Sequence, residues 1–186
     1  MSYITDHRAK FDNLKVCLEL KNRDQLRRTA NGGNSILFAY ESKDEILYLA
    51  KAEKLLPEAE FEFIDIAKLL VEFIDSFHDW SDFKQYYNEF AVTPHIIFKS
   101  EDSGVDLMDL IIRDIKRADE NNKIPVLIRT GSLYGTGIEN VNIMEHPAVM
   151  GLKQPLVLFY PSHINNDQLY FLNFKLASKY RCTVIE

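Results

Sequence analysis

Residues 35–40 read SILFAY and residues 155–161 read PLVLFYP, and both stretches are apolar almost throughout. Short apolar runs rich in β-branched and aromatic residues are typical of strands that are covered on both faces of a sheet. Three further runs have a similar composition: residues 61–66 (FEFIDI), 125–130 (PVLIRT) and 182–185 (CTVI). We therefore expect about five strands, with FEFIDI, the most alternating of them, nearer an edge.

Helical patterns lie between these runs, because apolar residues recur there at three- and four-residue steps. The segments expected to be helical are residues 4–20, 45–56, 66–77, 80–90 and 105–121. In the last of these, Leu107, Ile111 and Ile115 mark the inward face, and Asp79 is placed to cap the helix over 80–90. Alternation of strands and helices predicts a single α/β domain over residues 1–186, with a mainly parallel central sheet and helices on both faces.

Three segments have less decisive patterns. Residues 95–99 (HIIFK) fit either an edge strand or a buried loop. Residues 146–150 fit a short helical turn. In residues 162–178, the run Asn165-Asn166-Asp167 is a turn signal, and we expect a short helical or irregular stretch after it.

Charge and composition limit the classes of function. The chain has 22 basic and 28 acidic residues and a net charge of −6, which argues against a large nucleic-acid footprint because phosphate binding is mostly cationic. The distribution is uneven, with Arg23, Arg27 and Arg28 close together and residues 41–82 mainly acidic. These regions are either solvated faces or docking surfaces for a partner of opposite sign.

The sequence favours a cytoplasmic protein. Its first residues, MSYITDHRAKF, are polar and lack the apolar region of a signal peptide, and no apolar run approaches the roughly 18 residues of a membrane helix. The two cysteines, Cys17 and Cys182, have no zinc-type spacing and are interpreted as buried or half-buried thiols in a reducing compartment.

The first strand does not lead into a nucleotide-binding loop. A P-loop needs glycines followed by Lys and Ser or Thr, whereas residues 41–45 (ESKDE) contain no glycine and three carboxylates that would repel phosphate. The glycines Gly32 and Gly33 precede the strand instead. The order of elements resembles a degenerate P-loop-type core, and no cofactor is expected.

Residues 125–137 (PVLIRTGSLYGTG) form the most distinctive stretch, a strand that runs directly into a Gly-rich loop at 130–137. Ligands of open α/β sheets bind outside the carboxyl ends of the strands, where this loop begins. It fits either a small-ligand or anion site with Arg129 as the charged partner, or a tight turn that packs or docks onto a protein. Ser132 does not fit a nucleophile elbow, because G-x-S-x-G is absent.

Histidine spacing gives no metal signature, since H-E-x-x-H is absent. His146 and His163 are the only pair that the element order could bring together, as an acid–base pair or metal site near one end of the sheet. We expect no metal and no catalytic residue.

Residues 125–186 contain three short motifs: Gly131-Ser132-Leu133-Tyr134 after a strand, Phe159-Tyr160-Pro161 at the end of the next, and Tyr180-Arg181 before the last. As a set they resemble the small BrxB-type subunit of bacterial BREX phage-defence systems, a domain of unknown function. The motifs cover the last third of the chain, and length and element order are similar elsewhere. The resemblance implies a non-catalytic subunit in a complex with an alkaline-phosphatase-like PglZ subunit, a PglX methyltransferase and a large AAA-type ATPase.

Parallel strand order places residues 130–137 and 161–163 at one edge of the sheet. There Leu133, Tyr134 and Tyr160 are expected to be exposed and to form a partner surface, with a core position as the alternative for Tyr160. Tyr180 and Arg181 are expected to brace the fold or the partner face. The residues proposed for a partner or ligand surface are Arg129, Gly131, Ser132, Leu133, Tyr134, Gly135, Tyr160, His163 and Arg181. The alternatives are a ligand sensor or enzyme that uses loop 130–137, and a nucleic-acid-binding module.

Overall fold

The computed structural model describes residues 3–19, 22–100 and 104–186. Within these residues, parallel strands form the centre of the sheet in the order β2-β3-β4-β1-β7. Their bounds are β1 Ser35–Tyr40, β2 Phe61–Asp65, β3 Ile124–Ile128, β4 Leu156–Asn165 and β7 Cys182–Ile185. The five predicted strands and the mainly parallel sheet are confirmed, and β2 lies at an edge as expected.

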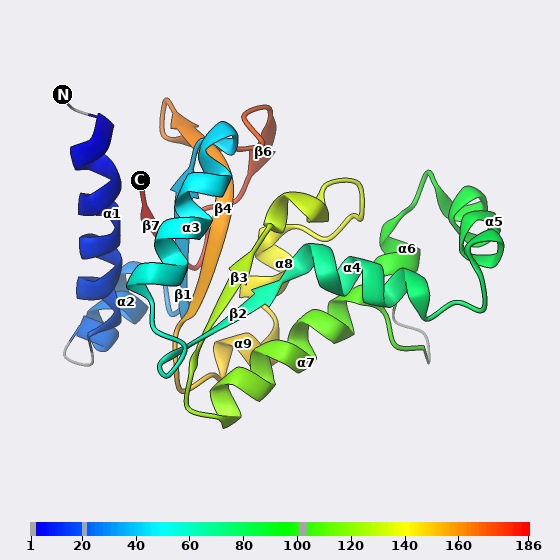
Figure 1. Ribbon diagram of the computed structural model, residues 1–186, viewed down its shortest axis with the longest axis horizontal. Helices are drawn as coiled ribbons and strands as arrows, with labels where there is room; N and C mark the ends of the chain where they lie inside the picture. The colour runs from blue at the N-terminus through cyan, green and yellow to red at the C-terminus, as the bar shows by residue number, and fades with distance from the viewer. Residues whose placement is uncertain (1–2, 20–21, 101–103) are drawn as a thin grey trace.

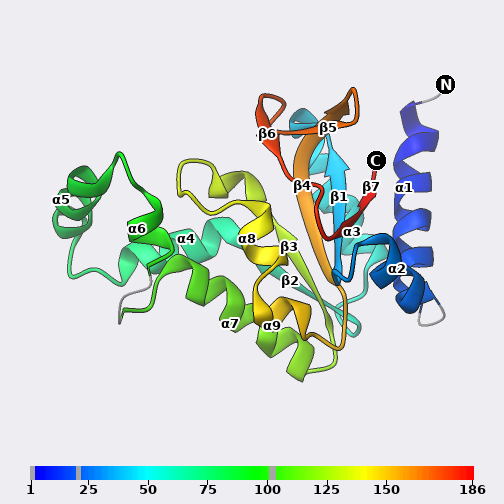
Figure 2. The ribbon, with the colours of Figure 1, turned by 180° about the vertical axis from the view of Figure 1, so that it is seen from behind.

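Helices cover both faces of this sheet (Figures 1 and 2). One face is covered by α1 (Tyr3–Leu18), α2 (Arg23–Thr29) and α3 (Glu45–Leu55). The other is covered by α4 (Ile66–Asp75), α7 (Leu107–Glu120), α8 (Asn140–Met144) and α9 (Pro147–Met150). Helices α5 (Trp80–Phe90) and α6 (His95–Phe98) lie beyond the sheet, beside the end of α4 that is farther from it (Figure 1).

Strand β1 is buried along its whole length, and its side chains alternate between the two cores. Ile36, Phe38 and Tyr40 point to the face of α1 and α3, while Leu37 and Ala39 point to the other face. Successive residues of a strand project to opposite sides, so an apolar strand has to be covered twice. This is why SILFAY predicts helices on both faces.

Aspartate side chains cap helices α4 and α5, and the cap of α5, Asp79, is predicted by the sequence. Asp65 ends β2 and accepts hydrogen bonds from the backbone N–H groups of Ala67 and Lys68 in α4. Asp79 accepts one from the backbone N–H of Asp82 in α5. Such a cap satisfies donors that the first helical turn leaves without a partner.

Two segments differ from the sequence-based expectations. The sequence of residues 95–99 fits an edge strand or a buried loop, but residues 95–98 form the short helix α6. The stretch 162–178, expected to be helical or irregular after a turn, contains an antiparallel hairpin in which β4 pairs with β5 (Gln168–Phe171) and β5 with β6 (Lys175–Ala177). Its two-residue loop has positive φ at Asn166 (49°) and Asp167 (62°), the geometry of a type I′ hairpin turn.

Gly33, which precedes β1, has a structural role that its position in the sequence does not reveal. A Cβ atom on Gly33 would lie 2.0 Å from the carbonyl oxygen of Arg181 and 2.8 Å from its Cβ atom. Arg181 leads into β7, whose Cys182 pairs with Ser35 at the start of β1. The missing side chain of Gly33 therefore makes room for the chain that enters the last strand.

We expect Gly33→Ala to lower the free energy of unfolding by about 1–3 kcal/mol, the usual range for overpacking a close contact. Thermal or urea unfolding followed by circular dichroism would measure the change. Gly104→Ala is the matched control, because nothing lies within 4 Å of a Cβ atom built there. Equal stability of the two variants would contradict the role assigned to Gly33.

Candidate functional site

The Gly-rich loop begins where β3 ends and is held against β4. Arg129 has a left-handed backbone (φ 52°), and residues 130–133 form a 3-10 turn, η3 (Thr130–Leu133). The Thr130 hydroxyl donates a 2.7 Å hydrogen bond to the carbonyl of Phe159. A Cβ atom on Gly131 would lie 3.7 Å from Pro161. The predicted meeting of loop 130–137 with residues 161–163 is therefore confirmed at Pro161, which lies within β4 rather than after it.

Two of the three apolar residues expected on the surface of this edge are buried. Leu133 and Tyr160 are each 3% exposed. Tyr160 stacks on Phe171 of β5 with ring centroids 4.6 Å apart, and burial raises the pKa of its hydroxyl. The expectation of exposure is wrong for Leu133, and Tyr160 takes the core position that was its alternative. The hairpin explains the burial of Tyr160, because it supplies the aromatic ring that covers this residue.

Tyr134 is the exposed aromatic residue of the loop. Its side chain is 55% exposed, and its ring contacts that of Phe174, itself 61% exposed, edge to face at 5.4 Å. Phe174 lies between β5 and β6. The loop and the hairpin thus present neighbouring aromatic rings at the carboxyl edge of the sheet.

Arg129 and Arg181, the two arginines proposed for the partner or ligand surface, each pair with a carboxylate of the protein. Arg129 pairs with Asp65, the residue that caps α4. Arg181 lies at the amino end of the sheet, where its Nε atom is 3.5 Å from a carboxylate oxygen of Glu145 and its guanidinium lies over the ring of Tyr180. Arg181 therefore does not join the surface around Tyr134, and its contacts are those of a brace.

The two histidines that were candidates for one site lie at opposite ends of the sheet. His146 caps α9 and follows Glu145, the partner of Arg181 at the amino end. His163 lies in the last part of β4 and stacks on Tyr170 at 5.4 Å. An acid–base or metal pair of His146 and His163 is therefore wrong.

An apolar groove continues from Tyr134 onto the helices beyond the sheet. It has a volume of about 370 Å³. Its lining residues are Leu70, Ile74, Trp80, Phe83, Lys84, Tyr87, Phe98, Ser132, Tyr134, Gly135 and Thr136. A Cβ atom on Gly137 would lie 2.9 Å from His95, so the loop packs closely on α6. The groove therefore joins α4, α5, α6 and the loop.

The sequence did not single out the α5 side of this groove. In the sequence Trp80 marks only the start of a predicted helix, whereas in the structure its side chain is 63% exposed. The sequence does contain a signal for it, which is the density of aromatic residues in 73–90. The buried face of such a short segment cannot hold all of these rings, so some of them remain on the surface.

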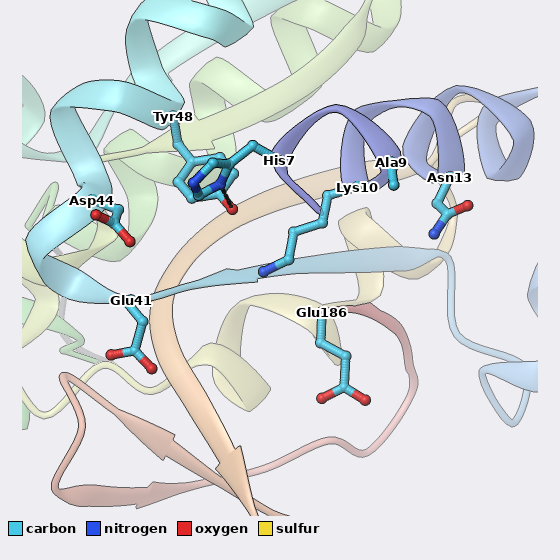
Figure 3. Close-up of a pocket in the computed structure, with 8 residues that line it drawn as sticks. All are labelled: His7, Ala9, Lys10, Asn13, Glu41, Asp44, Tyr48 and Glu186. Carbon is cyan, nitrogen blue, oxygen red and sulfur yellow. Dashed lines mark hydrogen bonds between the residues drawn. The ribbon is translucent and has the colours of Figure 1, made fainter. Parts of the chain in front are cut away.

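A second cavity, of about 290 Å³, lies at the carboxyl ends of β1 and β7 (Figure 3). It is lined by His7 and Lys10 of α1, by Tyr48 of α3, and by the carboxylates of Glu41, Asp44 and Glu186. A ring nitrogen of His7 and the Tyr48 hydroxyl share a hydrogen bond, and the Lys10 ammonium donates to the carbonyl of Ala39 at 3.2 Å.

This cavity occupies the place where a P-loop would cradle phosphate, and its chemistry is unsuited to that role. Three carboxylates face one ammonium group, and the residues after β1 form the turn η2 (Ser42–Asp44) without a glycine. The hairpin also reaches this end of the sheet, since the Asn173 amide donates a 3.1 Å hydrogen bond to Glu41. Negative charge at this position opposes the binding of an anionic ligand.

Other reactive groups are few within residues 3–19, 22–100 and 104–186. No group of three His, Cys, Asp or Glu side chains there could hold a metal ion. Cys17 is half-buried and Cys182 is buried, as expected, and burial raises the pKa of the Cys182 thiol to about 12. The thiol, which is protonated at neutral pH, is a poor nucleophile. In the same residues, no helix has the length and apolar character needed to cross a bilayer.

Comparison with protein-family models, with curated proteins and with solved structures finds no match to this chain. The function is therefore inferred from the chain's own residues and their geometry.

We expect the purified protein to show no turnover of ATP or GTP, because carboxylates occupy the phosphate position beside β1. A phosphate-release assay with Mg²⁺ would measure this. Lys43→Ala, in the turn after β1, should behave as wild type, and Lys54→Ala on α3 is the matched control. Turnover that Lys43→Ala abolishes and Lys54→Ala preserves would contradict the prediction.

Proposed function

We propose that the protein is a non-catalytic interaction subunit of a bacterial phage-defence complex of the BREX type, and that it binds the alkaline-phosphatase-like PglZ subunit. The observation that carries this proposal is the position of Tyr134. It belongs to the motif Gly131-Ser132-Leu133-Tyr134, it is exposed, and it forms part of the wall of an apolar groove.

The motifs that carry the family resemblance have a joint structural role that supports the proposal. A Cβ atom on Gly131 would lie 3.7 Å from Pro161 of the Phe159-Tyr160-Pro161 motif, and the Thr130 hydroxyl donates to the carbonyl of Phe159. Leu133 is buried beneath the loop. The two motifs thus fix the loop conformation that turns Tyr134 outward, which is the arrangement expected for a presented binding residue.

The composition of the groove is typical of a protein interface. Exposed Trp and Tyr side chains, such as Trp80 and Tyr134, are enriched at the energetic centres of interfaces, where they combine a large apolar surface with a polar tip. Contiguous apolar surface of this kind on a monomer marks a site that another molecule covers.

The alternative of a ligand sensor or enzyme has less support, because the polar groups of the loop are used internally. The Thr136 hydroxyl donates to the carbonyl of Leu133 and accepts from the backbone N–H of Ile138. Thr130 is likewise bonded to β4. A small-molecule site needs a few polar groups that converge on the ligand, and this groove has an almost wholly apolar lining.

Direct nucleic-acid binding is also disfavoured, in the proposal, by the charge of the segment that contains α5. Asp75, Asp79 and Asp82 are exposed on α4, the connection to α5, and α5 itself. These carboxylates would repel a phosphate backbone, whose binding depends on lysine and arginine. On the α5 side, the groove residues that can stack on bases therefore belong to a segment, residues 72–89, with five carboxylates and one lysine.

We expect Tyr134→Ala to leave the protein folded and to weaken binding to the phosphatase-like subunit by about 1–3 kcal/mol, the range for a good interface anchor. Titration calorimetry with purified wild-type and variant proteins would measure the affinities, with circular dichroism as the folding test. Val16→Ala is the control, because Val16 is 52% exposed but lies on α1, which covers the opposite face of the sheet from α4.

The proposal predicts that Tyr134→Ala lowers the affinity for the phosphatase-like subunit and that the control variant does not. Wild-type affinity for Tyr134→Ala would remove the loop from the interface. Equal loss in both variants would indicate a general effect on the fold or a partner surface elsewhere, and would also contradict it.

A further inference from the structure

We infer that the chain forms a two-fold symmetric dimer through the edge strand β2, which pairs antiparallel with β2 of a second copy in a register centred on Phe63. This dimer is independent of the proposed partner, because its contact surface is the outer edge of β2 rather than the groove that contains Tyr134.

The two edges of the sheet have different surroundings. At one edge, α1 and α2 lie beside β7 (Figures 1 and 2), and Phe11 and Leu14 of α1 share a core cluster with Ile185 of β7. At the other edge, no strand in the part of the chain that the structure describes pairs with the outer side of β2. An edge strand without a neighbour presents N–H and C=O groups to which the strand of another molecule can be added.

The outer side of β2 presents its backbone groups in a self-complementary order. The carbonyl of Glu60 accepts a 2.8 Å hydrogen bond from the N–H of Ile124 in β3, so the even-numbered residues of β2 direct their backbone groups toward β3. The residues between them, Phe61, Phe63 and Asp65, therefore direct theirs outward. This set is symmetric about Phe63, as an antiparallel pair of identical strands requires.

The register centred on Phe63 gives each outward group a partner. Phe63 of each copy would donate its N–H to the carbonyl of Phe63 in the other copy, and each Asp65 N–H would donate to the Phe61 carbonyl across the axis. The Phe61 N–H takes no part, because it donates to the carbonyl of Pro57 at 3.0 Å. The pairing joins the sheets of the two copies into one continuous sheet.

Side-chain packing also fits a second copy. A cavity of about 460 Å³ lies between α3 and the two outer strands, and Leu49, Phe63 and Ile128 form the apolar part of its lining. A two-fold axis perpendicular to the sheet keeps α3 of both copies on the same face, so the two cavities meet at the axis and the two Phe63 rings lie against each other. Directly opposed aromatic side chains stabilise antiparallel strands. Phe63, which is half-buried in the single chain, would be covered in the dimer.

Charge supports the antiparallel arrangement. Glu58 precedes β2 and Lys68 follows it; both are exposed and line the same cavity. Among the described residues, neither of them has an ion-pair partner, whereas Arg129 and Asp65 at the carboxyl end pair with each other. Antiparallel pairing places the acidic end of each β2 beside the basic end of the other, so complementary charges meet twice.

Reversal of these charges tests the geometry. We expect the wild-type protein to sediment as a dimer at micromolar concentrations in analytical ultracentrifugation. Glu58→Lys and Lys68→Glu should each weaken the dimer about tenfold, because like charges then meet at both ends. An equimolar mixture of the two variants should recover the wild-type affinity as a heterodimer, since each end then pairs a lysine with a glutamate.

The matched controls are Asp12→Lys and Lys15→Glu, which reverse exposed charges on α1, beside the other edge of the sheet. They should dimerise as the wild type does. Amide hydrogen exchange reports on the strand pairing itself. The N–H groups of Phe63 and Asp65 should exchange at least about tenfold more slowly in the wild-type dimer than in monomeric Glu58→Lys, because they are hydrogen-bonded across the axis.

A wild-type protein that stays monomeric throughout the micromolar range would overturn the inference. So would a dimer that both charge reversals leave intact, or one that the mixture of variants does not restore. Fast exchange of the Phe63 amide in a dimer would place the interface elsewhere and would also contradict the pairing through β2.

Discussion

The pairing of β1 with β4 and β7 is the constraint on which the rest of the structure depends. Every residue of β1 is buried, so both of its faces must be covered by other elements, and its register against β4 runs unbroken from Ser35 to Tyr40. The contact between the two strands is reinforced on one face by the stacked rings of Phe38 and Phe159, 4.7 Å apart. Helices on either side then follow from the alternation of side chains.

The two ends of this strand pair have different roles. At the amino end, hydrogen bonds and close packing connect the segments that enter the strands. The Asn34 amide donates to the carbonyls of Leu152 and Gln154, and the absence of a side chain at Gly33 leaves room for the backbone of Arg181. At the carboxyl end, β4 continues past β1 into the hairpin, which buries Tyr160 and places Pro161 against Gly131. The contacts at the amino end stabilise the fold, and the extension of β4 shapes the loop that carries Tyr134.

Local sequence patterns predict part of this fold. SILFAY and the stripe from Leu107 to Ala118 specify a doubly covered strand and an amphipathic helix within a few residues, and both are present. The hairpin was not predictable in the same way, because β5 and β6 are short and their pairing depends on positive φ at Asn166 and Asp167. The burial of Leu133 and Tyr160, and the groove beside Trp80, arise only when distant segments meet.

The acidic residues near the groove give its exposure a physical rationale. An exposed apolar surface is also a surface on which identical chains can associate. Asp75, Asp79 and Asp82 lie on the segment that carries Trp80 and are exposed, so their like charges disfavour contact between two copies of this segment. This effect requires that the carboxylates stay in solvent, because a carboxylate in the floor of the groove would have to be desolvated without compensation.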